Sequence, residues 1–307
     1  MSGNNVNWNM FICSDVLYCV LNMTTSTIDE SIQPDQGTQR EPTTWRPRIL
    51  PRIQPVAFYL SLALAGIMAV LFLPELLATL VTGFTAEAGA ELGIHRLHIM
   101  GIVAVVGVFL LGVAVQVYQP QKKVAAMWGA FLVILTVSIG TVAYGVGRPE
   151  EVLPFLTVTT IALISHPAGR NLLRRGRSYS PALLGMLAIA AVPIAAFVVS
   201  QQTLTLAGDE HAIMGHYVMM TGLMIAPFAY GIFAALGFTG WRLAAYLAGL
   251  PMAYYGILSI AFPAQPGSTG VLWGAAAIVW AVVFVAIAEY SRRTDSRIFR
   301  RDVKVRR

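Results

Sequence analysis

The sequence predicts an all-α integral membrane protein with eight transmembrane helices. Apolar residues make up 56% of its 307 residues, charged residues only 12%, and the mean hydropathy is +0.66. A soluble globular protein carries about 25% charged residues. The composition therefore argues against a soluble enzyme, a disordered protein and a nucleic-acid-binding domain. Crossing the hydrocarbon core takes roughly 20 helical residues, and the chain contains several uncharged intervals of about that length.

The apolar segments are separated by charged or helix-breaking residues. The interval 243–288 has no charged residue, but Pro263, Pro266 and Gly270 interrupt it. Proline and glycine end a helix here, so two helices joined by a turn are expected. The segment 152–168 is the shortest of the set. The predicted helices are 56–80, 97–118, 124–145, 152–168, 181–201, 211–236, 241–262 and 271–289.

The distribution of basic residues supports the number eight. Lys and Arg accumulate in the short cytoplasmic loops of membrane proteins. Eight crossings put 19 of the 21 Lys and Arg residues on the side of both termini, and only Arg96 and Arg148 on the other. Removing the segment 152–168 would destroy this alternation. We therefore expect a multi-pass protein of the cell membrane with both termini in the cytoplasm.

The chain divides into five parts on this basis. Residues 1–53 are expected to be a disordered cytoplasmic segment, because a Ser/Thr/Gln/Asp-rich stretch follows Met23. Residues 54–169 and 181–291 are two four-helix membrane regions, joined by a basic cytoplasmic linker, 170–180. Residues 292–307 form a basic cytoplasmic tail, which we expect to contact anionic lipid headgroups. Both cysteines precede residue 20, so no thiolate site is expected in the membrane region.

The two membrane regions show signs of an internal duplication. An offset of 118 superposes Glu91 on Asp209 and His98 on His216. Each pair is a carboxylate followed seven residues later by histidine, at the outer entrance of a helix. Two halves of four helices each would be related by an axis along the membrane normal, as in transporters with parallel repeats.

Histidines are the main candidates for a functional site. His95 and His98 are three residues apart and share a helix face, whereas His211 and His216 are five apart and should diverge on one helix. Interfacial histidines can also lie at a wet membrane boundary with no role beyond that. His166 is expected to be a helix-end residue at the cytoplasmic interface.

The functional interpretation places His98 and His216 as axial ligands of haem b between the halves. Glu91 and Asp209 would orient the imidazoles through their other ring nitrogens, and His95 and His211 are weaker candidates. His95 or His211 could instead complete a copper or zinc site. The thioethers of nearby methionines suit Cu(I), although methionine in apolar helices usually only packs. The nearby methionines are Met100, Met214, Met219 and Met220.

In this architecture, and in Glu91…His95-Arg96 at the second helix, the chain resembles the haem A synthase family. The resemblance covers residues 54–293 in architecture, and it implies b-type haem and oxidation of a methyl group of haem O. That family has two residues between glutamate and histidine, where Glu91 and His95 have three, and histidines in its fourth and eighth helices. Here the eighth helix has none. The resemblance therefore implies at most half of the family's haem ligands for this chain.

Several functions remain open at this point. The first is a haem-binding membrane protein, in electron transfer or haem modification, whose enzymatic activity the sequence does not decide. The second is a permease for a small or apolar substrate, with its path between the halves. The third is a membrane assembly or scaffold protein without a cofactor. The expected partners are the lipid bilayer and a further membrane protein, and no nucleic acid.

Overall fold

The computed structural model describes residues 50–85, 90–174, 176 and 179–305, with the side chains of 50–52, 69, 75, 90–94, 170 and 292–305 excepted. Residues 1–49 of the predicted segment 1–53, with both cysteines, and the side chains of the basic tail lie outside the described residues. Every regular element in the described part is helical. In a bilayer a helix satisfies its own backbone hydrogen bonds, which the hydrocarbon core does not provide.

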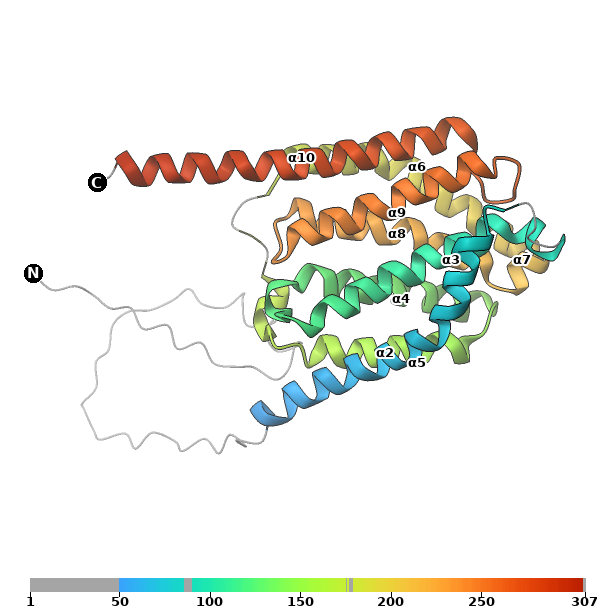
Figure 1. Cartoon of the computed structure of the whole chain (residues 1–307), viewed down its shortest axis with the longest axis horizontal. Coiled ribbons are helices and arrows are strands. Elements are labelled where there is room, and N and C mark those ends of the chain that lie inside the picture. The colour runs from blue at the N-terminus through green and yellow to red at the C-terminus, as the bar shows by residue number, and fades with distance from the viewer. Residues whose placement is uncertain (1–49, 86–89, 175, 177–178, 306–307) are drawn as a thin grey trace, which may run out of the picture. The chain divides into compact units, whose positions relative to one another are not determined.

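The described chain forms nine α-helices and three short 3₁₀ helices (Figure 1). Most predicted segments correspond to one helix each. The helices are α2 (Leu50–Thr82), α3 (Ala90–Ala114), η1 (Val115–Val117), η2 (Pro120–Lys122), α4 (Val124–Tyr144), α5 (Pro149–Ile164), η3 (Gly169–Leu173), α6 (Pro181–Ala207), α7 (Glu210–Ile213), α8 (His216–Ala235), α9 (Trp241–Ala261) and α10 (Gly270–Val305).

Seven helices are long and apolar enough to cross a membrane. The protein is therefore a multi-pass membrane protein. The segment predicted at 152–168 also forms a helix, α5, but it has only 16 residues. At a rise of 1.5 Å per residue, α5 is roughly 24 Å long, less than the hydrocarbon thickness of about 30 Å. Length and composition thus support seven spans, and the eighth remains a prediction.

Two boundaries differ from the sequence prediction. Helix α2 begins at Leu50, within the segment expected to be disordered. Helix α10 continues to Val305, through the segment predicted as a tail. The membrane span ends where the bilayer ends, but the helix can continue beyond it. No proline or glycine follows Gly274, so nothing in the sequence interrupts α10.

The loops meet at two opposite ends of the bundle. At one end, which we call the basic end, Ala125 N–H donates to Thr239 O at 3.0 Å, and the Trp128 indole donates to Leu172 O at 2.9 Å. At the other, which we call the histidine end, Gly147 N–H donates to Ile213 O at 2.8 Å. Within the described residues, the segments that connect the long helices at the basic end are 118–123, 165–174, 179–180 and 236–240, and those at the histidine end are 83–85, 145–148, 208–215 and 262–269.

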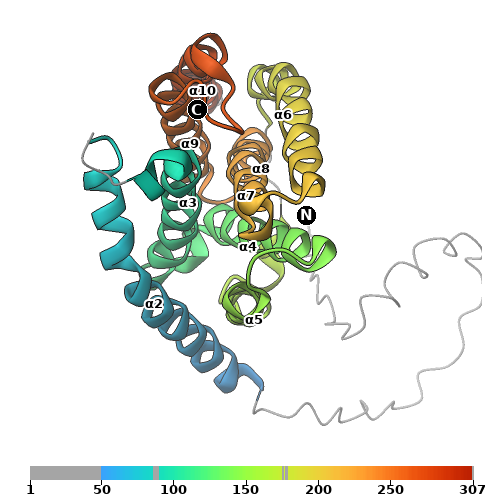
Figure 2. The same cartoon turned by 90° about the vertical axis from the view of Figure 1, so that its right-hand side faces the viewer.

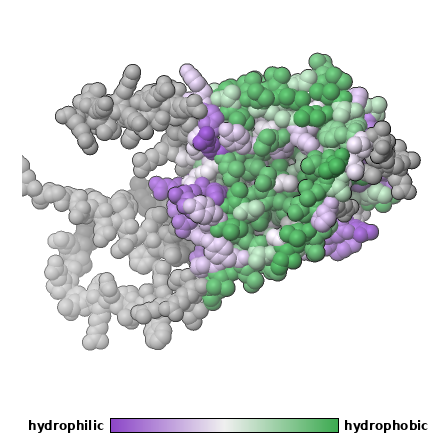
Figure 3. Space-filling model, viewed as in Figure 1, coloured by the Kyte–Doolittle hydropathy of each residue, from purple (hydrophilic) through white to green (hydrophobic). Residues whose placement is uncertain are grey.

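Helix α8 lies at the centre of the packing. It packs against α3, α4, α6 and α9 (Figure 2), and the side chains of Tyr217, Leu223 and Tyr230 are fully buried. The outer helices α2, α6 and α10 carry exposed apolar side chains such as Leu71 and Val192. On the face that Figure 3 displays, apolar residues cover the middle and hydrophilic residues gather toward both ends. This is the surface expected for contact with lipid chains.

Candidate functional site

Four histidines converge at the histidine end of the bundle. His95 and His98 lie in the first turns of α3, His211 lies in α7, and His216 is the first residue of α8. The ring centroids of His95 and His211 are 4.3 Å apart, and those of His98 and His211 are 4.9 Å apart. His216 lies 5.3 Å from His95, 5.5 Å from His98 and 5.8 Å from His211. We call these four residues the histidine cluster.

A break between α7 and α8 brings His211 and His216 together. Gly215 has a φ of 76°, a left-handed conformation that glycine adopts without steric cost. A Cβ at this position would lie 3.1 Å from the Cα of Gly147, so the close approach also requires glycine. The prediction that His211 and His216 diverge was therefore wrong, because it assumed one continuous helix.

Three members of the cluster are buried with unpaired ring nitrogens. His98 is fully buried, and only 8% of His95 and 9% of His216 is exposed. Within the described residues, neither nitrogen of His98 has a hydrogen-bond partner, nor does Nδ1 of His95 or His216. Buried polar atoms are nearly always paired in folded proteins. The unpaired nitrogens are therefore available to bind a ligand.

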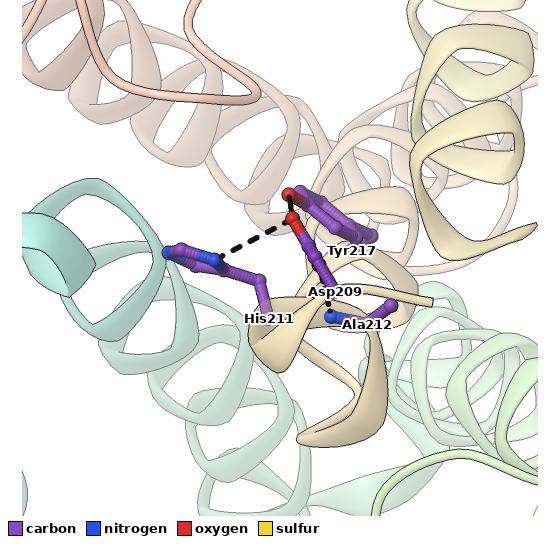
Figure 4. A network of polar contacts seen from close by, with 4 residues as sticks. All are labelled: Asp209, His211, Ala212 and Tyr217. Atoms are coloured by element: carbon purple, nitrogen blue, oxygen red, sulfur yellow. Dashed lines mark hydrogen bonds and ion pairs between the residues drawn. The ribbon is translucent and has the colours of Figure 1, made fainter. Parts of the chain in front are cut away.

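Asp209 organises the side of the cluster next to α7 (Figure 4). Its carboxylate caps α7 by accepting the Ala212 N–H at 2.8 Å, and it accepts the Tyr217 hydroxyl at 2.8 Å. The Nδ1 atom of His211 lies 3.7 Å from the same carboxylate. Desolvation alone would raise the pKa of Asp209, but the hydrogen bonds from Ala212 and Tyr217, aided by His211, lower it overall. The side chain thus remains a carboxylate at neutral pH.

The two predicted orienting carboxylates have different outcomes. Asp209 was expected to orient His216, but its described contacts are with His211, Tyr217 and Ala212. The cause is the break at Gly215, which removes the helical spacing assumed for Asp209 and His216. Glu91 lies in the first turn of α3, and its side chain lies outside the described residues.

The ring positions resemble those around one metal ion, although the ring orientations do not. With metal–nitrogen bonds of about 2.0–2.1 Å, four tetrahedral imidazoles place their ring centroids about 5 Å apart. The five separations given above, out of six possible pairs, run from 4.3 to 5.8 Å. Among the described residues, however, no three His, Cys, Asp or Glu side chains form a group that could hold a metal ion. Binding would require the rings to rotate.

Two of the predicted thioether ligands pack away from the cluster. The sulfur of Met100 is 3.9 Å from the Tyr254 hydroxyl, and Met220 packs against Gly101. Met214 is exposed, and Met219 is partly buried against the core. No described contact joins any of these sulfurs to the histidine rings.

His166 lies at the basic end, far along the bundle from the cluster. It follows the end of α5, as predicted, and its side chain is fully buried. The Ala168 N–H donates to Nδ1 at 3.1 Å, which leaves the proton on Nε2, 3.2 Å from the Gln116 side-chain oxygen. Both ring nitrogens are therefore paired, and His166 is a structural histidine.

Sequence reasoning missed two residues of this region. Tyr217 was not singled out, although it directly follows His216 and holds Asp209. Gln201 is 1% exposed, and neither amide atom has a partner among the described residues. The sequence did contain a signal for Gln201, which is a glutamine near the end of a long apolar helix. Burying an amide there without a hydrogen-bond partner costs free energy.

Comparison with known proteins gives no relative for this chain: no family model, curated protein or solved structure matches it at a significant level.

Proposed function

We propose that the chain crosses the membrane eight times, with both termini in the cytoplasm. The support comes from the ends of α5. Gly147, just before α5, contacts Ile213 at the histidine end. Pro167, just after it, accepts a hydrogen bond from Gln121 at the basic end. Helix α5 therefore runs the full distance between the two sets of loops, and tilting or local bilayer thinning accommodates a short helix.

We further propose that the two halves are a duplication related by a pseudo-two-fold axis. In the first half α2, α3, α4 and α5 form a ring of neighbours, and α6, α8, α9 and α10 form the same ring in the second. Between the halves, α3 packs on α8 and α9, and α4 packs on α8 and α9. Exchanging the halves leaves this set of neighbours unchanged.

Equivalent residues also meet at the proposed axis. The offset of 118 relates His98 to His216 and Gly112 to Tyr230. The rings of His98 and His216 are 5.5 Å apart and nearly parallel, at 17°. A Cβ on Gly112 would lie 2.8 Å from the Tyr230 hydroxyl. Such self-pairing is expected for helices beside a two-fold axis.

The function that the geometry supports best is binding of a transition-metal ion by the histidine cluster. The observation that carries this proposal is the gathering of four imidazoles, three of them buried with unpaired nitrogens. Neutral imidazole is the commonest metal ligand in proteins. A cation at the centre of the cluster would bind one nitrogen of each ring, after rotation of the rings about their side-chain bonds.

Zinc or copper suits this ligand set best. Imidazole binds Zn, Cu, Fe and Ni well, whereas Mg and Ca prefer oxygen ligands. Asp209, 3.7 Å from Nδ1 of His211, is placed to hold that ring so that its Nε2 ligates. A copper ion would give the site a role in electron transfer, and a zinc ion would give it a structural or hydrolytic role.

A shared haem b fits the same residues less well. Two axial imidazoles place their ring centroids roughly 6 Å apart, with the porphyrin between them. The 5.5 Å between His98 and His216 is close to that value. The ring of His95 lies 5.3 Å from that of His216, and the ring of His211 lies 4.9 Å from that of His98. Both rings occupy space that a porphyrin would need. A bare ion requires no such space.

A permease path between the halves gains no support from the packing. Tyr230 lies in that interface, fully buried, and its hydroxyl is 3.4 Å from Ala126 O. A Cβ on Gly129 would lie 1.9 Å from the Tyr230 ring. The centre of the interface is thus filled by an aromatic ring packed against glycine.

Metal binding is tested by titrating purified, chelator-treated protein with Zn²⁺ and with Cu⁺, and measuring bound metal after desalting. We expect one ion per chain. His98→Ala and His216→Ala should each reduce the affinity by at least about tenfold, since each removes a ligand. His166→Ala is the matched control, because it removes an equally buried histidine at the basic end and should leave metal binding unchanged.

The same preparation separates an ion from haem. Expression with excess haem should give no Soret absorption if the cluster binds a bare ion. A Soret band that disappears in both His98→Ala and His216→Ala would replace the metal-ion proposal by haem. Absence of both bound metal and haem would contradict cofactor binding altogether.

A further inference from the structure

A cavity of about 960 Å³ lies between α6 and α10, with Met224 of α8 and Met252 of α9 behind it. Figure 2 shows α6 and α10 on the same side of α8. The lining contains no Asp, Glu, Lys or Arg residue. Ile189 and Leu272 stand on its two walls, with 70% and 79% of their surface exposed. The cavity therefore opens toward the lipid-facing surface, and a ligand would enter from the bilayer.

The end of the cavity nearest the histidine cluster is polar. Gln201 lines it, is 1% exposed, and has an unpaired amide nitrogen and an unpaired amide oxygen. The Gln201 oxygen and the His98 Nε2 each lie 3.2 Å from the position of a Cβ on Gly267. A side chain at position 267 would therefore crowd these two buried groups, both of which can form hydrogen bonds.

Aromatic rings surround this polar end. Phe197 lies one helical turn before Gln201 on the same face of α6, and its ring contacts that of Tyr255 edge-on at 5.3 Å. The Tyr255 hydroxyl donates to Gly267 O at 3.2 Å, which fixes the loop above the cavity. At the opposite end, the Trp280 indole donates to Met186 O at 3.0 Å and joins α10 to α6. This hydrogen bond ties the two walls of the cavity together at that end.

We propose that this cavity binds an isoprenoid quinone taken from the bilayer. A lining without charge selects a neutral ligand, because a charged headgroup would be desolvated without a partner. Pockets of this size bind small ligands through apolar walls and a few polar groups that fix orientation. The quinone ring packs beside Phe197 and Tyr255, one carbonyl oxygen accepts a hydrogen bond from the Gln201 amide, and the isoprenoid tail leaves between α6 and α10.

The polar end of this cavity adjoins the proposed metal site at His98. Gln201 is not one of the four histidine ligands, so quinone binding is tested on metal-free protein. Decylubiquinone is titrated into the full-length protein in detergent micelles and its binding measured by calorimetry, with decylbenzene as the ligand that keeps the tail and ring but has no carbonyl. We expect saturable binding of the quinone at one site per chain, and weaker binding of decylbenzene by about tenfold or more.

Three variants locate the site. Gln201→Leu removes the amide at nearly constant volume and should weaken quinone binding by about tenfold. Gln202→Leu, the same change at the next residue, should have no effect, since Gln202 does not line the cavity. Ala276→Trp on the α10 wall should prevent binding by filling the cavity. Equal binding of decylbenzene and quinone, or unchanged quinone binding in Gln201→Leu or Ala276→Trp, would overturn the proposal.

Discussion

Asp209 is the residue on which the arrangement around His211 depends most. Its carboxylate caps α7, accepts the Tyr217 hydroxyl and lies beside His211. Asparagine caps helices as well as aspartate does, so Asp209→Asn should keep the fold and lose the negative charge. We expect metal affinity to fall about 10–100-fold, as for other carboxylates that orient a ligating imidazole. Competition titration measures this, with the exposed neighbour changed in Glu210→Gln as control. Equal affinities in Asp209→Asn and wild type would contradict the orienting role.

The lowered pKa of Asp209 gives a pH dependence with a definite sign. Its folded-state pKa lies below the ordinary value of 3.8. The ionised carboxylate therefore stabilises the fold at every pH above about 4, and this stabilisation is lost as the pH falls through the folded-state pKa. The effect should be small, because 45% of the side chain is exposed. The melting temperatures of metal-free wild type and Asp209→Asn should differ at pH 7, and the difference should shrink as the pH falls below the ordinary pKa of 3.8. A difference that grows on acidification would show that the sign is wrong.

At the scale of the helices, contact between α4 and α8 depends on a glycine. The Tyr230 ring of α8 lies where a side chain on Gly129 would be, whereas Gly107 of α3 has open space around it. Gly129→Ala should destabilise the protein by about 1–3 kcal/mol through overpacking. Gly107→Ala should be neutral or stabilising by up to about 1 kcal/mol, because alanine favours the helix. Thermal unfolding in detergent compares the two. Equal melting temperatures would contradict the packing at Tyr230.

The helices were the part of the fold most open to prediction, since a bilayer excludes charge and a helix must be long enough to cross it. Each predicted segment is helical, including the short α5, but the segment 211–236 divides into α7 and α8. The break at Gly215 was not predicted, because glycine is also tolerated inside membrane helices. That one residue decides where His211 lies. The members of the histidine cluster could thus be proposed from sequence, but their mutual positions and the contacts of Asp209 could not.

At the scale of the whole molecule, the number of crossings decides on which side of the membrane each loop lies. Glu150 lies in the first turn of α5, and Tyr179 lies after α5, before α6 begins. After Cys13 and Cys19 are changed to serine, Glu150→Cys should react with an impermeant maleimide on intact cells, and Tyr179→Cys should react only after lysis. This result is expected because, in our proposal, α5 carries the chain across the bilayer. Labelling of both positions from the same side would mean that α5 does not cross.

The cavity and the histidine cluster were not equally accessible to sequence reasoning. The cluster consists of four of the five histidines, a residue type whose position near helix ends is noticeable. The cavity is formed by apolar residues of α6 and α10 that look like any other membrane-facing residue. Only the packing of the two helices shows that they leave space between them. Gln201 is a candidate binding residue only because it lines that space.

The central claim is that the four imidazoles hold one metal ion, and X-ray absorption at the metal edge tests it most directly. Protein loaded with one equivalent of zinc should show about four nitrogen ligands near 2.0–2.1 Å, with the outer-shell scattering of imidazole rings and no sulfur ligand. His98→Ala should lower the number of imidazoles, whereas His166→Ala should not. A spectrum dominated by sulfur or water ligands, or one unchanged in His98→Ala, would contradict the account.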